Sequence, residues 1–376
     1  MNDPKYRFFR IAAFALIILA LFDLGLRFYF HSETRIFRNV SKGNSSLPYL
    51  FEVMDRHKGT TIAFLGSSVM QGYINCGDRE HFPYLVGENL RKAGIKRTRT
   101  INLASAGNHF GDDFCLLYET LKHKPDLVII EVHFKLFSTY GEFAKAISHE
   151  DNTYYIRDYP ERDKLLEMFQ IGNSDYRQIL FENAIKRVWA FYRYKDMVTD
   201  HWTDSSDPPA FLSAQSFLDT FDFTNYEAKM ARRHNPETHD QEYLWKVLPE
   251  NLINRDISIC NALDTTQTSV NWVILKMIAE LGKQHKQKMI FYFSPVNRAF
   301  IDQYQLFDMK KLDDIKMEAA HIALEYGHYF LDYTNVVKPA FFSDTDHINR
   351  SGHRQVAERM SGDILKRFKP RAKKKD

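Results

Sequence analysis

The chain has 376 residues, of which 44% are hydrophobic and 26% are charged. This composition is typical of a folded protein and excludes a wholly disordered chain. Lysine and arginine number 51 against 48 aspartates and glutamates, a net charge of +3, so the overall charge gives no reason to expect a nucleic acid as partner.

The N-terminus predicts a membrane anchor. An apolar run over 11–22, extended by aliphatic and aromatic residues to Phe30, follows three cations in the first ten residues. A helix over this stretch is long enough to cross a bilayer, although Asp23 is costly there unless it pairs with a neighbour. A cleaved signal peptide and an amphipathic or buried helix are the alternatives, but no A-x-A cleavage site follows the run. The positive-inside rule predicts a single-pass protein of the cell membrane, with its N-terminus cytoplasmic and the remainder extracytoplasmic.

Five short apolar segments predict the strands of a sheet. They lie within 61–65, 99–107, 125–134, 287–295 and 328–334. The unbroken apolar character of most of 127–132 is typical of a strand covered on both faces, as in parallel sheets. Strands that alternate with helical patterns predict a doubly wound α/β fold, in which ligands bind at the carboxyl ends of the strands.

The pattern divides the chain into an anchor, a linker, an α/β domain, an insertion and a tail. The predicted ranges are 1–31 for the anchor, 32–59 for the linker, 60–149 with 286–368 for the α/β domain, 150–285 for a mainly helical insertion and 369–376 for a basic tail. The insertion either packs on the sheet as a second layer or forms a lid or docking surface. The tail is either a solvated end or a contact with anionic lipid or polymer.

The three cysteines do not indicate a disulfide framework or a zinc site. Cys76, Cys115 and Cys260 are an odd number without CxxC spacing, which argues against a disulfide scaffold and a zinc ribbon. At most one bridge can form within the chain, and buried free thiols are the expected state.

The segment "TIAFLGSSVMQGY", residues 61–73, leaves its predicted strand through Gly66, Ser67 and Ser68. A Gly-rich turn after a strand can bind phosphate through backbone N–H groups, but this one lacks both the GxGxxG spacing and the ending of a P-loop. The other interpretation is a nucleophilic serine. That interpretation requires a histidine base and a carboxylate to orient it.

The segment "SDTDHINRSGH" supplies both groups, with Asp344 three residues before His347 and a helical pattern after them. In a catalytic triad the carboxylate orients the imidazole, which takes the proton of the serine hydroxyl and later returns one to the leaving group. A metal site formed by this segment with His353 is an alternative, as is a surface pair without function.

These motifs resemble those of the SGNH (GDSL-like) hydrolase superfamily, whose fold is a flavodoxin-like parallel sheet. "FLGSSV" is similar to its Gly-Asp-Ser block, with Ser67 in place of Asp, which implies Ser68 as the nucleophile. The closing Asp-x-x-His block of the family matches Asp344 and His347, and the resemblance favours Asp344 over Asp346 as the orienting carboxylate.

The two middle blocks of the family concern the oxyanion hole. Asn102 and Gly107 match the second block, which implies that the backbone N–H groups of Ser68 and Gly107 stabilise the oxyanion. The third block, Gly-x-Asn-Asp, is replaced by "EVHFKLF", which puts Lys135 at the Asn position. Lys135, or His133 if it turns inward, is then the candidate for the missing donor.

Three traits resemble the membrane-anchored transfer proteins of D-alanyl-lipoteichoic acid synthesis and their relatives in envelope polysaccharide O-acylation. They are the anchor, Gly-Ser-Ser in place of Gly-Asp-Ser, and the long insertion before "FYFSPVN". The superfamily resemblance covers 60–368 without the insertion. It implies a bacterial serine acyltransferase that moves an acyl group through Ser68 to a hydroxyl of a cell-envelope glycan or teichoic-type polymer. It also implies a membrane-bound O-acyltransferase as partner, and no cofactor or metal.

Two other functions fit the same residues. An esterase or deacetylase uses water in place of the polymer hydroxyl. A catalytically silent binding subunit of an envelope acylation complex is the other function, and the missing third-block Asn favours it.

Overall fold

The computed structural model describes residues 4–32, 47–72, 79–190, 192–193, 242–306 and 309–368. The predictions for Cys76, for the basic tail and for the centre of the insertion lie outside these ranges. Cys115 and Cys260 are free and buried, as predicted.

The centre of the molecule is a parallel sheet of five strands in the order β2-β1-β3-β4-β5. The strands are β1 (Thr60–Leu65), β2 (Thr98–Asn102), β3 (Leu127–Val132), β4 (Met289–Phe293) and β5 (Tyr329–Asp332). All six residues of β3 are buried, because helices cover both faces of the sheet. The predicted doubly wound, flavodoxin-like α/β fold is therefore confirmed.

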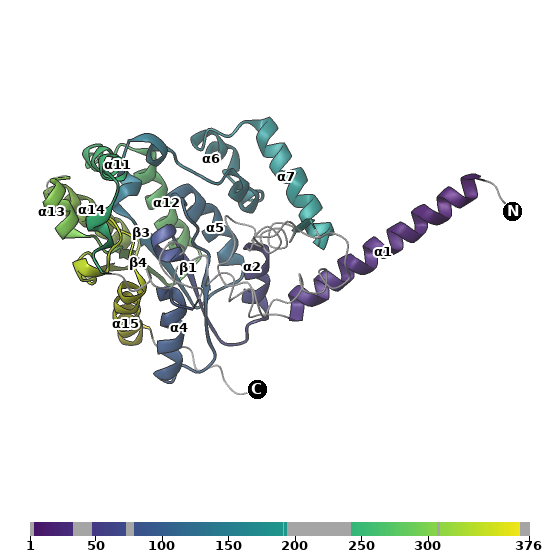
Figure 1. Cartoon of the computed structure of the whole chain (residues 1–376), viewed down its shortest axis with the longest axis horizontal. Coiled ribbons are helices and arrows are strands. Elements are labelled where there is room, and N and C mark those ends of the chain that lie inside the picture. The colour runs from purple at the N-terminus through teal and green to yellow at the C-terminus, as the bar shows by residue number, and fades with distance from the viewer. Residues whose placement is uncertain are drawn as a thin grey trace.

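Helices flank the sheet on two sides (Figure 1). On one side α4 (Phe82–Lys92) packs against α15 (Arg350–Arg367). On the other side α12 (Val270–Gln284) packs against both α5 (Phe110–Lys122) and α14 (Met309–Glu325). Because α12 precedes β4 and flanks the sheet, it is the crossover helix that a parallel strand pair requires. The α/β layers thus begin again at Val270, before the predicted boundary at 286.

The predicted insertion is helical where it is described. Its elements are η4 (Glu150–Ile156), α6 (Arg162–Met168), α7 (Asn173–Val188), η5 (Leu244–Val247) and α11 (Glu250–Asn261). The first of these, η4, packs against α5 and α7. Shorter elements elsewhere are α3 (Ser68–Gln71), η2 (Phe134–Phe137), η3 (Gly141–Ala144), α13 (Arg298–Tyr304) and η6 (Pro339–Phe341).

The predicted linker over 32–59 is wrong for its second half, because residues Leu47–Arg56 form helix α2. One face of α2 is buried in the core through Leu47, Tyr49, Leu50, Phe51, Val53 and Met54. These apolar residues recur at helical spacing, and burying that face stabilises a helix that is too short to be stable alone.

Helix α1 (Pro4–Ser32) extends away from the rest of the chain (Figure 1). Its segment Phe9–Phe28 has a mean hydropathy of 2.2 and is only 6% buried, so its length and composition suit a membrane span; a signal sequence meets the same criterion. Asp23 is paired with Arg27 at 2.8 Å, one helical turn away, which lowers the cost of the carboxylate that argued against an anchor.

Candidate active site

A cleft of about 350 Å3 lies at the carboxyl ends of β1 and β3. Ser68 follows β1, Lys135 follows β3, and His347 lies on the loop between β5 and α15; all three line the cleft. Parallel strands deliver their following loops to one edge of the sheet, which is why segments so distant in sequence meet here.

The structure brings the serine, histidine and aspartate motifs together. Ser68 Oγ lies 2.8 Å from His347 Nε2, and His347 Nδ1 lies 2.7 Å from Asp344 Oδ2. The other carboxylate oxygen of Asp344 accepts hydrogen bonds from the backbone N–H groups of Asp346 (2.9 Å) and His347 (2.7 Å). Asp346 Oδ2 is 3.9 Å from the same imidazole nitrogen. The imidazole is therefore hydrogen-bonded to Asp344 and not to Asp346.

The carboxylates also set the charge of the imidazole. Burial lowers the pKa of His347, but Asp344 and Asp346 outweigh burial and raise that pKa to about 9. Burial raises the pKa of Asp344, whereas the neighbouring His347 lowers it below its ordinary value, so Asp344 is ionised at neutral pH.

The turn before the serine depends on Glu131, which the sequence analysis did not single out. Glu131 Oε2 accepts hydrogen bonds from Ser67 N at 2.7 Å and from Ser67 Oγ at 2.9 Å. Glu131 is 1% exposed near the carboxyl end of β3, and burial raises its pKa. One charged residue within an otherwise apolar strand was the available signal, because a buried polar group requires a partner.

Gly66 is required because Glu131 is so close. A Cβ atom at Gly66 would lie 2.5 Å from Glu131 Oε2 and 2.6 Å from Glu131 Cβ. We expect Gly66→Ala to lower the free energy of unfolding by about 1–3 kcal/mol and to slow any reaction at Ser68. The matched control is Gly362→Ala in α15, where no atom lies within 4 Å of the added Cβ, and which should stabilise by about 0.5–1 kcal/mol. Urea unfolding of the wild type and the two variants measures both changes in the free energy of unfolding. Equal stability of Gly66→Ala and Gly362→Ala contradicts the role of Gly66.

Two backbone N–H groups are candidates for an oxyanion hole. Ser68 is the first residue of α3, and Gly107 has φ +80°, a conformation that favours glycine. Within the described part of the chain, neither N–H group has a hydrogen-bond acceptor. Asn102 of the second block donates to Met70 O at 3.3 Å and accepts from Ala104 N at 3.1 Å, so it joins the loop after β2 to α3.

The ammonium group of Lys135 is paired with two carboxylates. Its Nζ lies 2.5 Å from Asp346 Oδ1 and 2.9 Å from Asp256 Oδ1, so two of its three N–H groups face carboxylates. This geometry does not support the prediction that Lys135 supplies the oxyanion donor. His133 does turn toward the cleft, but its Nε2 lies 2.8 Å from Asp346 Oδ2, without the alignment of a hydrogen bond.

The alternative of a metal site is less consistent with these contacts. Ligand atoms of Asp344, Asp346 and His347 do lie within 4.8 Å of one another. The Lys135 ammonium group already pairs with Asp346, however, and repels a cation. His353 lies apart: it accepts a hydrogen bond from Phe82 N at 3.3 Å, and burial lowers its pKa to about 3.

The fold and the site thus define a doubly wound α/β protein in which a serine is hydrogen-bonded to a histidine and that histidine to an aspartate. No protein-family model and no curated protein sequence matches the chain. Among solved structures, it is similar to an acetyl xylan esterase (10% identity, 81% of this chain and 99% of that one, TM-score 0.36). It is also similar to an extracellular lipase from Streptomyces rimosus (12% identity, 81% and 99%, TM-score 0.32).

Proposed function

We propose that this chain is a serine acyltransferase of the SGNH type, anchored in the cell membrane, that carries an acyl group on Ser68 and passes it to a hydroxyl group of a cell-envelope glycan or teichoic-type polymer. The observation that carries the chemistry is the pair of short contacts from Ser68 Oγ to His347 Nε2 (2.8 Å) and from His347 Nδ1 to Asp344 Oδ2 (2.7 Å). The apolar helix α1 and the extracytoplasmic topology predicted from its flanking charges support the envelope location.

In the proposed reaction, His347 Nε2 takes the hydroxyl proton of Ser68 as Oγ attacks the acyl carbon of the donor. The resulting imidazolium is stabilised by the Asp344 carboxylate. The N–H groups of Ser68 and Gly107 stabilise the oxyanion, and His347 then protonates the leaving group. In the second half of the reaction, His347 removes a proton from the acceptor hydroxyl, whose oxygen attacks the acyl carbon of the acyl-serine. The bond between the acyl carbon and Ser68 Oγ then breaks, and His347 returns the proton to Oγ.

Water as the acceptor makes the same site an esterase or deacetylase. The partial exposure of His347 (18%) and Asp344 (26%) to solvent favours this second candidate. The two are separated by following free acid and acylated glycan with the full chain in detergent, an activated aryl ester as donor and a glycan as acceptor. A transferase forms acylated glycan at the expense of free acid when the glycan is abundant. Free acid that is independent of the glycan identifies an esterase and overturns the transfer proposal.

A membrane-bound O-acyltransferase is the proposed partner, because transfer on the outer face requires an acyl group delivered across the bilayer. If Ser68→Ala supports envelope acylation in cells as well as the wild type does, the chain is a binding subunit and the enzymatic proposal is overturned.

A further inference from the structure

A cluster of buried charges lies beside the proposed triad. At its centre is Lys135 on η2, whose side chain is 7% exposed. Its Nζ lies 2.9 Å from Asp256 on α11 and 2.5 Å from Asp346 on the His347 loop. One ammonium group therefore joins three elements: η2, which follows β3, the helix α11 of the insertion, and the loop that holds His347.

Thr345 closes the same cluster. Its Oγ1 lies 2.5 Å from Asp256 Oδ2 and 2.8 Å from Asp346 Oδ1, so its single proton can be donated to either carboxylate. Burial lowers the pKa of Lys135, yet Asp346 and Asp256 outweigh burial and raise it, so the ammonium form persists. Burial raises the pKa of Asp346, but Lys135 and His347 hold it well below its usual range. Charges buried this deeply are tolerated only when they are paired.

The position of Asp346 explains why this pairing matters. Two carboxylates are close enough to compete for the imidazole N–H of His347, since Asp344 Oδ2 lies 2.7 Å and Asp346 Oδ2 lies 3.9 Å from Nδ1. The Asp346 carboxylate is instead in contact with Lys135 Nζ at 2.5 Å and with His133 Nε2 at 2.8 Å.

We propose that Lys135 is a positioning residue that holds Asp346 away from His347, so that Asp344 alone orients the imidazole. Through Asp256, Lys135 also links α11 to the loop that holds His347. This inference rests on the proposed role of His347 as general base. Through this ion pair, α11 of the insertion helps to position the residues of the site that it also lines.

Lys135→Met keeps much of the side-chain length and removes the charge. We expect single-turnover acylation by a chromogenic ester to slow by roughly a hundredfold, because a freed Asp346 misplaces the imidazole. The pH midpoint should move upward, because a cation that opposes protonation of His347 is lost. The charged groups that act on the pKa of His347 are Asp344, Asp346 and Lys135. His353, which lies outside the cleft, has an electrostatic interaction with His347 as well. Adding Asp346→Asn should restore much of the rate, because the competing carboxylate is then neutral; a purely packing role predicts no such rescue.

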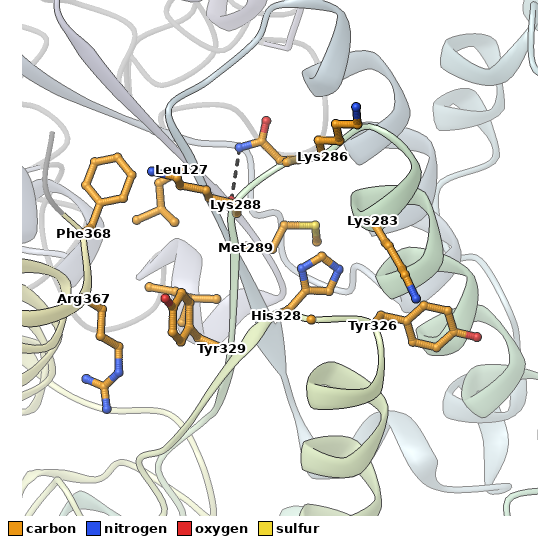
Figure 2. A pocket seen from close by; sticks show the side chains of 13 residues that line it. Leu127, Lys283, Lys286, Lys288, Met289, Tyr326, His328, Tyr329, Arg367 and Phe368 are labelled. Carbon is orange, nitrogen blue, oxygen red and sulfur yellow. Dashed lines mark hydrogen bonds between the residues drawn. The ribbon is translucent and has the colours of Figure 1, made fainter. Parts of the chain in front are cut away.

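The matched control is Lys283→Met. Lys283 lies beside Tyr326, with its Nζ 5.5 Å from the ring centroid, in a separate pocket (Figure 2). That pocket is formed at the first residues of β4 and β5, Met289 and Tyr329, and thus at the opposite end of the sheet from Ser68. We expect Lys283→Met to keep the wild-type rate and midpoint.

Asp256→Asn tests the inference if Lys135→Met does not fold, because it keeps the Lys135–Asp346 pair and removes the negative charge on α11 that pairs with Lys135. The amide oxygen of asparagine can still accept the hydrogen bond from Thr345. It should slow acylation and leave the pH midpoint in place. A Lys135→Met protein that matches Lys283→Met in rate and midpoint overturns the positioning role, and an unchanged rate in Asp256→Asn overturns the part assigned to α11. A wild-type protein without acylation is a different result, since it overturns the proposed function itself.

Discussion

Ser68→Ala is expected to abolish labelling of the full chain by a fluorophosphonate probe and to lower acyl turnover by about a millionfold, the loss typical of removing a triad nucleophile. The reason is that Ser68 Oγ is the hydroxyl hydrogen-bonded to His347 Nε2, at 2.8 Å. Labelling followed by gel fluorescence, together with turnover of a chromogenic ester, measures both losses.

Ser67→Ala is the control, because the hydroxyl group of Ser67 is hydrogen-bonded to Glu131, whereas that of Ser68 is hydrogen-bonded to His347. Its hydroxyl donates to buried Glu131 at 2.9 Å, and its backbone N–H makes a second bond to the same oxygen at 2.7 Å that alanine retains. We expect most labelling to remain and the free energy of unfolding to fall by about 0.5–1.5 kcal/mol. Labelling that is lost in Ser67→Ala and kept in Ser68→Ala contradicts the assignment of the nucleophile.

Asp344→Asn is expected to slow acylation by about ten thousandfold, as the corresponding change does in serine proteases. The amide oxygen accepts from the backbone N–H groups of Asp346 and His347, so the amide NH2 faces His347 Nδ1 and fixes the wrong tautomer of the imidazole. The pH dependence should change as well. Acylation requires neutral His347, so the wild-type rate should rise with pH through a midpoint near 9, the pKa that Asp344 and Asp346 impose against the effect of burial. Removing the negative charge of Asp344 destabilises the imidazolium, so the midpoint should move downward.

Asp346→Asn separates the two carboxylates. Asp346 also raises the pKa of His347, so its removal should lower the midpoint too. It makes no hydrogen bond to the imidazole, however, and we expect a much smaller loss of rate. Single-turnover acylation across pH for the wild type and both variants is the measurement. A larger loss of rate in Asp346→Asn shows that the orienting carboxylate was chosen wrongly, and an unchanged profile in His347→Ala removes the catalytic role of the histidine.

The sequence by itself determined the sheet and the contact between Asp344 and His347. The central strands β3 and β4 are short apolar runs, because burial on both faces of a parallel sheet requires apolar residues at successive positions. The outer strands β2 and β5 are less buried and carry polar residues. Asp344 and His347 are three residues apart, so a single turn of chain is enough to bring carboxylate and imidazole into contact. The distinction between Asp344 and Asp346, by contrast, came from a resemblance and not from spacing.

Only the tertiary structure decided what joins Ser68 to a histidine 279 residues away, since that contact depends on β1 and β5 ending at the same edge of the sheet. The tertiary structure also shows that Lys135, a candidate oxyanion donor by sequence, pairs with Asp256, which lies 121 residues further along the chain. A charged residue carries no mark of its partner in the sequence, because an ion pair requires only that two side chains meet in space. The partner of Lys135 is therefore fixed by where α11 packs, and the packing of α11 depends on the whole fold.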